Sequence, residues 1–111
     1  MAVVTAAHDA AEHLERAVRS VAEQTVAVAE HIVVDDGSTD DTPALLEALR
    51  QRFPHLVCIH QRQQGSAVAR NRGIQEASAR YIAFLDADDW WHPQEVEQQV
   101  RFMESTGAVF T

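Results

Sequence analysis

Three carboxylates lie within four residues near the end of the sequence, directly after an apolar segment. Residues 81–85 are apolar, and Asp86, Asp88 and Asp89 follow them. On an extended backbone, residues two apart point the same way, so Asp86 and Asp88 can face one ligand together. A hard divalent cation, with phosphate oxygens on its far side, would relieve their mutual repulsion. The spacing predicts a metal and diphosphate site, although a solvated acidic turn with Asp89 capping the next helix is the commoner role of such pairs.

A second carboxylate pair, Asp35 and Asp36, follows the apolar residues 32–34. A carboxylate at the tip of a strand can accept hydrogen bonds from a base N–H or from ribose hydroxyls. The alternative is a plain Asp-Gly-Ser turn, with Asp40 or Thr42 capping the next helix. Taken alone the turn is favoured, and only the neighbouring motifs favour a binding role for Asp36.

Two arginines follow a glycine and a serine that can start a helix. Arginine matches phosphate geometry with two parallel hydrogen bonds, and a helix N-terminus offers free N–H groups. Because residues two apart on a helix do not share a face, we expect Arg70 to reach a ligand and Arg72 to be solvated. Gly73 is costly inside a helix, which indicates a close backbone approach or a kink.

The remaining polar and aromatic residues near the acidic segment have ambiguous roles. His92 is either a metal ligand or a helix cap, and a cap is commoner for a lone histidine. Trp90 and Trp91 either close over a ligand or seal the base of the next helix against the sheet; sealing is favoured for one of them, and the sequence does not tell which. The other histidines lack zinc-ligand spacing, and Walker A and Gly-x-Gly-x-x-Gly patterns are absent. Cys58 lies in an apolar run and is expected to be a small buried residue.

Four short apolar runs, spaced by helix-length segments, organise the chain. We expect strands at 2–5, 31–34, 56–59 and 81–85, and helices at about 10–23, 42–53, 65–77 and 93–107. Runs that are apolar on both faces are typical of a buried parallel sheet. The alternation therefore predicts an α/β fold: a parallel, Rossmann-like sheet with helices on both faces, in three α/β/α layers.

Two local features extend this interpretation. Asp9 and Glu12 form a candidate capping box for the first helix. Residues 108–111 look like the start of a fifth strand. In such sheets ligands bind beyond the carboxyl ends of the strands, which is where the carboxylate pairs lie.

Composition limits the partners of the chain. Its 111 residues make one domain at most, and 46% of them are hydrophobic, as in ordinary globular proteins. The net charge of -8 argues against binding nucleic acid or anionic lipid. No apolar stretch is long enough for a membrane span, and the start lacks a signal peptide. We expect a cytoplasmic location, either free or peripheral to the inner face of the membrane.

Taken in order, five blocks of the chain resemble family 2 glycosyltransferases of the GT-A fold. The last two blocks together are the most specific. The blocks are 3–8, 20–25, 32–42, Gly65 with 69–73, and 81–89. The resemblance implies inverting transfer of a sugar from a nucleotide-diphosphate donor to an acceptor hydroxyl on a glycan or a lipid-linked glycan. It also implies a divalent cofactor, Mg²⁺ or Mn²⁺.

The resemblance also assigns roles to residues. It places Thr5 in the nucleotide pocket, Asp36 on the base with Asp35 beside it, and Arg70 near the diphosphate. It makes Asp86-Ala87-Asp88 the Asp-x-Asp motif, with Asp88 as metal ligand and Asp86 towards the ribose. The implied nucleotide-sugar-binding residues are Thr5, Ala7, Asp35, Asp36, Arg70, Asp86 and Asp88, and the implied metal ligands are Asp88 and Asp86.

Two departures from the family pattern matter. Family members usually have an aromatic residue at Ala7 and commonly Asn at His8, so stacking on the base is either weaker or supplied by another group. The family's general base, a carboxylate, has no counterpart here and is expected beyond residue 111. We therefore interpret residues 1–111 as a single donor-binding part of a GT-A domain, truncated at its C-terminal end. We expect this part alone to show little turnover and to self-associate.

Two rival functions remain. A nucleotidyltransferase would need a glycine-rich basic loop after the first strand, and residues 6–9 provide none. A catalytically silent module for nucleotide-sugar binding or assembly is the alternative to an active glycosyltransferase.

Overall fold

The computed structural model describes residues 1–106 of the chain. Four strands alternate with four helices, and the expected fifth strand at 108–111 lies outside the described residues. The strands are β1 (Ala2–Ala7), β2 (Glu30–Asp36), β3 (Leu56–Gln61) and β4 (Ile82–Phe84). The helices are α1 (Leu14–Ala22), α2 (Thr42–Arg52), α3 (Ser66–Glu76) and α4 (Glu95–Thr106).

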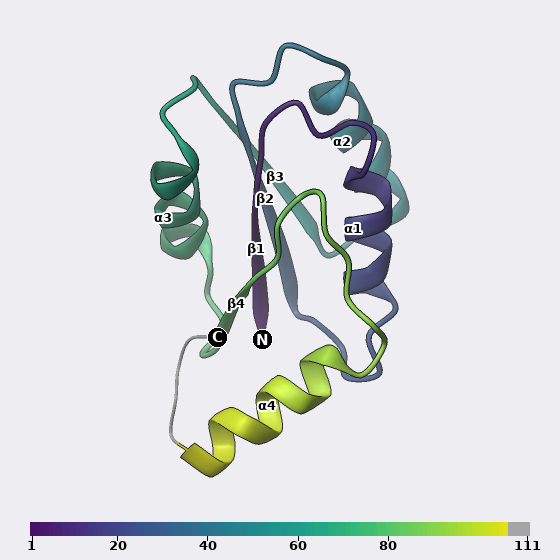
Figure 1. The fold of residues 1–111 in the computed structure, drawn as a ribbon, viewed down its shortest axis with the longest axis vertical. Coiled ribbons are helices and arrows are strands. Elements are labelled where there is room, and N and C mark those ends of the chain that lie inside the picture. The colour runs from purple at the N-terminus through teal and green to yellow at the C-terminus, as the bar shows by residue number, and fades with distance from the viewer. Residues whose placement is uncertain (107–111) are drawn as a thin grey trace.

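The strands form one parallel sheet in the order β3-β2-β1-β4. Helices α1 and α2 lie on one side of this sheet and α3 lies on the other, while α4 crosses below its lower end (Figure 1). The predicted three-layer α/β/α fold is therefore confirmed. The register pairs Asp35 with Ala7 on one side and with His60 on the other, so the last residues of β1, β2 and β3 lie together at the carboxyl end of the sheet.

Both faces of the sheet are buried along β1 and most of β2, which is why the middle of these strands is apolar, whereas the edge strand β3 is only partly buried. One cluster joins the sheet to α1 and α2 and includes Val33, Leu14 and Leu46. The opposite cluster includes Val4 and Ile32 beneath α3. Neighbouring residues along β1 and β2 thus point to opposite helix layers, as the pleat of a strand requires.

Helix α3 packs against the sheet at unusually short range, as predicted from Gly73. A Cβ atom at this position would lie 2.4 Å from Cγ1 of Val4, closer than real atoms approach. The residue is helical and needs no special backbone angle here. Glycine is required because the backbone of α3 lies against β1.

Helix α1 begins at Leu14, later than the expected start near residue 10. The candidate capping box does not form, because α1 has His13 at its N-cap and no side-chain cap. Asp9 instead adopts a positive φ of 49° and its Oδ1 accepts the N–H groups of Thr39 (2.8 Å) and Asp40 (3.2 Å). The side chain therefore joins the loops that follow β1 and β2, a partnership 30 residues away that local spacing does not reveal.

Helix α4 is fastened to α1 by one buried amide. Gln24 accepts the Val96 N–H at 2.8 Å and donates to the carbonyl oxygens of Ser20 and His92, both at 2.9 Å. α4 begins at Glu95, two residues after the expected Pro93, because Pro93 and His92 belong to the loop that these bonds hold.

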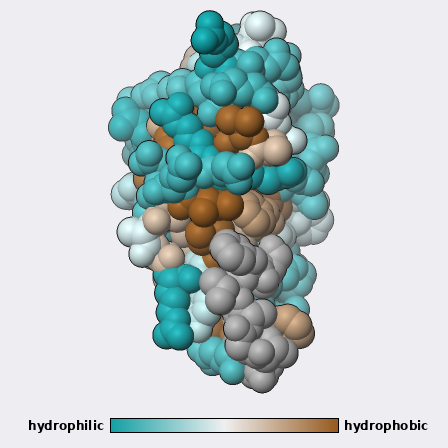
Figure 2. All heavy atoms as spheres, turned by 90° about the vertical axis from the view of Figure 1, so that its left-hand side faces the viewer, coloured by the Kyte–Doolittle hydropathy of each residue, from teal (hydrophilic) through white to brown (hydrophobic). Residues whose placement is uncertain are grey.

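On the face that carries α3, hydrophobic side chains gather at mid-height and also reach the surface in the upper part, where hydrophilic residues surround them (Figure 2). Partly buried apolar residues of the cluster under α3 include Ile59, Ile74 and Phe84. In the described part of the chain, no helix is long and apolar enough to cross a membrane.

Candidate functional site

Two adjoining hollows lie where β1, β2 and β4 end. The first, of about 230 Å³, is the Asp36 hollow, lined by Ala6, Ala7, His8, Asp36, Gln63, Gly65 and Ser66. The second, of about 430 Å³, is the acidic-turn hollow, lined by Ala6, His8, Asp9, Ala10, His13, Ser66, Arg70, Asp86, Ala87 and Asp88. Ala6, His8 and Ser66 line both. The hollows therefore adjoin along the carboxyl end of the sheet, where ligands of such folds bind.

Asp36 is the most completely bonded carboxylate at this edge. It is only 4% exposed. Its Oδ1 accepts hydrogen bonds from the Gln61 side chain (2.9 Å) and the Gln64 N–H (2.8 Å), and its Oδ2 accepts from the Gly65 N–H (3.0 Å). Burial alone would raise the pKa of Asp36, but these three hydrogen bonds outweigh it and hold the pKa below 3.8. Asp36 is therefore an ionised, fixed acceptor.

Gly65 makes this arrangement possible. Its φ of +102° lies in a region that side-chain-bearing residues rarely adopt. That angle turns its N–H towards Asp36 just before α3 begins at Ser66. The predicted glycine at the helix start thus binds the carboxylate through its backbone.

Asp35 has a different position from its neighbour. Its Oδ1 accepts the Ser38 N–H at 3.1 Å and its Oδ2 accepts from Nδ1 of His60 at 3.0 Å. The residue is 3% exposed and lines neither hollow. Asp35 therefore holds the turn after β2 and lies behind Asp36.

Thr5 and Ala7 occupy opposite situations on β1. Ala7 lines the Asp36 hollow, so this expected site residue lies beside Asp36. The Thr5 side chain is 0% exposed, and its hydroxyl is hydrogen bonded to Nε2 of His31 at 2.9 Å. The structure thus places the Thr5 hydroxyl in the core under the site and does not bring it into either hollow.

The acidic segment is a turn, not the extended strand end that the spacing suggested. β4 stops at Phe84, and the Asp89 N–H donates to the Asp86 carbonyl at 3.0 Å. Ala87 points into the core and is 7% exposed, while Asp86 and Asp88 are exposed. Both carboxylates nevertheless line the same hollow, because the turn is anchored between them by Ala87.

The two arginines of α3 separate as predicted. Arg70 lines the acidic-turn hollow, and its Nη2 lies 3.5 Å from Oδ1 of Asp86. Arg72 is exposed and lines a separate depression on the far side of α3. Arg70 thus supplies positive charge on the same wall as the acidic turn.

Asp86 and Asp88 would bind a divalent ion only together with ligands from water or substrate. No three His, Cys, Asp or Glu residues among residues 1–106 are grouped as a metal cluster. In that part of the chain the Asp88 carboxylate has no hydrogen-bond or ion-pair partner, so its oxygens are available. Mg²⁺ and similar ions are commonly bound by one or two carboxylates together with waters and substrate phosphates. The donor set of Asp86 and Asp88 fits that kind of binding.

The residues after the turn take structural roles. Nδ1 of His92 accepts the Gln94 N–H at 3.3 Å, so His92 caps the start of α4. Trp91 packs against the core cluster of Val3 and Val21, whereas Trp90 is 53% exposed. Trp91 is therefore the tryptophan that seals the sheet. Cys58 is half-buried, and burial raises the pKa of its thiol to about 11, which agrees with a packing role.

His8 was singled out only as a departure from the family pattern, yet it lies at the junction of the two hollows. Its Nδ1 is 2.7 Å from the Asp36 carbonyl oxygen, and because a carbonyl only accepts, Nδ1 carries the hydrogen. In the neutral ring Nε2 is then an acceptor, 3.5 Å from the Gln63 amide nitrogen. The only sequence signal for this role is that His8 directly follows β1.

Comparison with known proteins agrees with this architecture. The profile of glycosyl transferase family 2 matches residues 2–111, and the chain belongs to that family. It is 38% identical over 114 residues to the putative teichuronic acid biosynthesis glycosyltransferase TuaG of Bacillus subtilis. It is 34% identical over 112 residues to the "UDP-Glc:alpha-D-GlcNAc-diphosphoundecaprenol beta-1,3-glucosyltransferase WfaP" of Escherichia coli. In both cases all of this chain matches 44% of the relative, so the chain spans less than half of their length.

Solved structures show the same fold. S. aureus TarS (residues 1–349, with UDP) superposes with a TM-score of 0.84 at 23% identity, over 96% of this chain and 32% of that one. The mannosyltransferase PcManGT of Pyrobaculum calidifontis, solved with GDP-Man and Mn²⁺, also gives 0.84 at 24% identity, over 92% and 31%. The fold is that of GT-A glycosyltransferases.

Proposed function

We propose that this chain supplies donor and metal binding for an inverting glycosyltransferase that uses a nucleotide-diphosphate sugar. The observation that carries the proposal is the continuity of the two hollows. A fixed acceptor, Asp36, lies in one, while Arg70 with its partner Asp86 and the Asp88 carboxylate, unpaired among residues 1–106, lie in the other. A nucleoside in the first hollow and a diphosphate with its metal ion in the second would satisfy both.

Asp36 has one acceptor site left for a ligand. An ionised carboxylate offers about four lone-pair sites. Gln61, Gln64 and Gly65 occupy three, and the remaining one is on Oδ2. A base N–H or a ribose hydroxyl would complete the set, with Ala7 and His8 forming the adjacent wall and Asp35 supporting the turn from behind.

The diphosphate end needs added positive charge. Arg70 is the one arginine that lines the acidic-turn hollow, against three carboxylates, Asp9, Asp86 and Asp88. When bound, Mg²⁺ or Mn²⁺ would supply the charge that neutralises the departing diphosphate. Asp88 would hold the ion and Asp86 would face the ribose, while Arg70 would bind a phosphate oxygen.

The relatives indicate the class of substrate. TarS was solved with UDP and with UDP-GlcNAc, and PcManGT with GDP-Man and Mn²⁺. The names of WfaP and TuaG point to a lipid-linked glycan and to teichuronic acid. We therefore propose a glycan or lipid-linked glycan acceptor, in polysaccharide biosynthesis.

Calorimetry would test the proposal directly. UDP, GDP and dTDP are each titrated into the chain with and without MnCl₂, and at least one should bind more tightly with Mn²⁺. Asp88→Asn should remove the metal-dependent gain. Glu76→Gln, which removes an exposed charge at the far end of α3, is the matched control and should keep it.

Two outcomes decide against the proposal or narrow it. If no nucleoside diphosphate binds under either condition, the donor site is refuted. If a nucleotide-sugar binds but a panel of acceptors never yields free nucleoside diphosphate, the silent binding module is the better description of this chain.

A further inference from the structure

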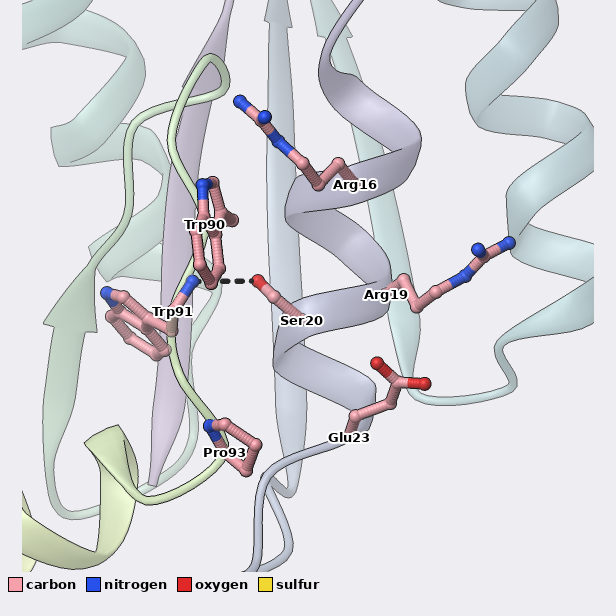
Figure 3. A pocket seen from close by; sticks show the side chains of 7 residues that line it. All are labelled: Arg16, Arg19, Ser20, Glu23, Trp90, Trp91 and Pro93. Atoms are coloured by element: carbon pink, nitrogen blue, oxygen red, sulfur yellow. Dashed lines mark hydrogen bonds between the residues drawn. The ribbon is translucent and has the colours of Figure 1, made fainter.

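A third hollow lies outside the donor site, between α1 and the segment 90–93. It encloses about 400 Å³ and is lined by Arg16, Arg19, Ser20, Glu23, Trp90, Trp91 and Pro93. Figure 3 shows Trp90 standing between the loop and α1, with Arg16 near its upper end, and Pro93 and Glu23 lower down. Nothing in the donor-binding scheme uses this hollow.

The lining combines aromatic rings with charged groups. Trp90 is 53% exposed, a high value for so large an apolar side chain. Arg16, Arg19 and Glu23 also line the hollow, and of these Arg16 lies beside the Trp90 ring. An indole face is apolar, as are the C–H faces of a pyranose ring, while sugar hydroxyls need hydrogen-bonding partners. The hollow offers both: the aromatic groups come from the segment 90–93, and the charged groups come from α1 and from Glu23 directly after it.

The backbone of the loop that carries Trp90 is held in place before any ligand arrives. The Trp90 N–H donates to Oδ1 of Asp89 at 2.8 Å, and the Trp91 N–H donates to Oγ of Ser20 at 3.2 Å. At the lower end the Thr25 N–H donates to the Pro93 carbonyl at 2.8 Å. Such anchoring reduces the ordering cost of binding.

Arg16 connects this hollow to the acidic turn. Its Nη2 donates to the Asp88 carbonyl at 3.3 Å, and its guanidinium lies 6.0 Å from the centre of the Trp90 ring. Arg16 has no carboxylate partner among residues 1–106, whereas Arg19 is paired with Glu15 at 2.9 Å. Trp90 therefore lies two residues after Asp88, the carboxylate that would hold the metal ion next to the diphosphate.

We propose that this hollow, with Trp90 as its stacking surface, binds a pyranose ring of the acceptor saccharide. The inference rests on the proposed glycosyltransferase function, because only that function supplies a saccharide acceptor. The adjacency to Asp88 fits an acceptor held next to the donor diphosphate. The charged rim distinguishes the surface from one built only to exclude water.

Intrinsic fluorescence tests the inference, because both tryptophans of the chain line this hollow. Glucose, N-acetylglucosamine, cellobiose and chitobiose are titrated at millimolar concentration. At least one should change the tryptophan emission in a saturable way, and the disaccharides should bind no more weakly than the monosaccharides. No saturable change with any of them overturns the inference.

Variants separate stacking from structure. Trp90→Ala should weaken saccharide binding by about tenfold or more, measured by calorimetry, whereas Trp90→Phe should retain most of it. Phe102→Ala removes another exposed aromatic ring, 57% exposed on α4, and should bind as the parent does. Equal binding by Trp90→Ala and the parent overturns the proposal.

Parallel titrations keep this proposal distinct from the donor site. Nucleoside diphosphate with Mn²⁺ should bind Trp90→Ala as it binds the parent. If the nucleotide binds and no saccharide does, this inference fails while the proposed function stands. If neither binds, the proposed function itself fails. If only UDP-glucose, and neither UDP nor any free saccharide, gives a Trp90-dependent response, the ring belongs to the donor and the acceptor assignment is overturned.

Light scattering tests whether a second copy of the chain, instead of a saccharide, occupies the hollow. A Trp90-dependent dimer without any saccharide response would show that a second copy of the chain fills the hollow, which also overturns the proposal. A saccharide response from a species whose mass does not depend on Trp90 supports it.

Discussion

Asp36 and Asp88 are both carboxylates at the carboxyl edge of one sheet, yet their surroundings are opposite. Asp36 is 4% exposed and accepts three hydrogen bonds from the segment 61–65. Asp88 is exposed on a turn, and its side chain has no partner in the described part of the chain. The carboxylate at one end of the candidate donor site is largely bonded within the chain and has one acceptor site left for a ligand, whereas the Asp88 carboxylate at the other end has no partner among residues 1–106.

The contrast suggests a division of labour. A fixed acceptor selects by geometry, because a mismatched ligand leaves a buried charge incompletely bonded. An exposed carboxylate such as Asp88, which is unpaired among the described residues, binds by charge, which depends on a cation being present. We therefore expect the two ends to respond differently to substitution, to pH and to metal.

The largest expected effect is on stability. Asp36→Ala leaves two backbone N–H groups without their acceptor and should lower the free energy of unfolding by about 3 kcal/mol. Asp88→Ala should change it by less than about 0.5 kcal/mol, because no contact is lost. Urea unfolding followed by tryptophan fluorescence measures both. Equal losses for the two variants would remove the distinction.

Low pH should reduce the free energy of unfolding through two residues of β2, His31 and Asp36. Burial lowers the pKa of His31 from 6.5 to about 3, so the folded protein keeps this ring neutral while the unfolded chain protonates it. Stability is therefore full above pH 6.5 and falls as pH drops from 6.5 towards about 3, by about 2 kcal/mol at pH 5. Asp36, whose pKa is also lowered, adds a further loss below pH 3.8. Unfolding midpoints at pH 7, 6 and 5 are the measurement.

His31→Gln is the matched control for the acid effect. It removes the titrating ring and keeps an amide that can bond the Thr5 hydroxyl, so the slope between pH 6.5 and 5 should flatten even if stability at pH 7 is lower. His55, whose pKa burial also lowers, would leave a small residual slope. An unchanged slope would mean that His31 is not the group responsible.

The exposed end should respond to metal. Asp88→Asn should reduce the affinity for nucleoside diphosphate in the presence of Mn²⁺ by about 1 to 2 kcal/mol, because a charged partner of the ion is lost. Without metal the variant should bind as well as the parent or better, since one repulsive charge is gone. Calorimetry under both conditions would show this, and a loss that persists without metal would contradict it.

The smallest effect concerns the nucleoside alone. Asp36→Asn keeps the shape of the side chain but replaces one acceptor oxygen with a donor, so free nucleoside should bind about 1 kcal/mol more weakly. The loss should be the same with and without Mn²⁺. If uridine, guanosine and thymidine all bind the variant as they bind the parent, Asp36 serves only the turn.

Sequence reasoning predicted the features that depend on local pattern. Runs such as 31–34, apolar on both faces, gave the strands and the layer order, and the spacing of Arg70 and Arg72 separated their faces correctly. Gly73 indicated the close approach of α3 to β1. These features follow from periods of two or 3.6 residues and from the properties of single residue types.

The parts that sequence reasoning missed depend on distant or backbone partners. The donors to Asp36 include the N–H groups of Gln64 and Gly65, which every residue except proline possesses, so no residue type announces them. Asp9 accepts a hydrogen bond from the Thr39 N–H instead of capping α1, and the Thr5 hydroxyl on β1 is hydrogen bonded to His31 on β2. The roles of Trp90 and Trp91 were divided only by the path of the loop after the turn.

The close contact of α3 with β1 has a consequence for ligand affinity. Gly73 lies one helical turn after Arg70 on the same face, so the depth at which α3 sits on Val4 also sets how far the Arg70 guanidinium reaches towards Asp86. A methyl group at residue 73 would push α3 away from β1 and move the Arg70 guanidinium out of the acidic-turn hollow. The geometry of the exposed contact between Arg70 and Asp86 therefore depends on Gly73, a buried residue that has no side chain.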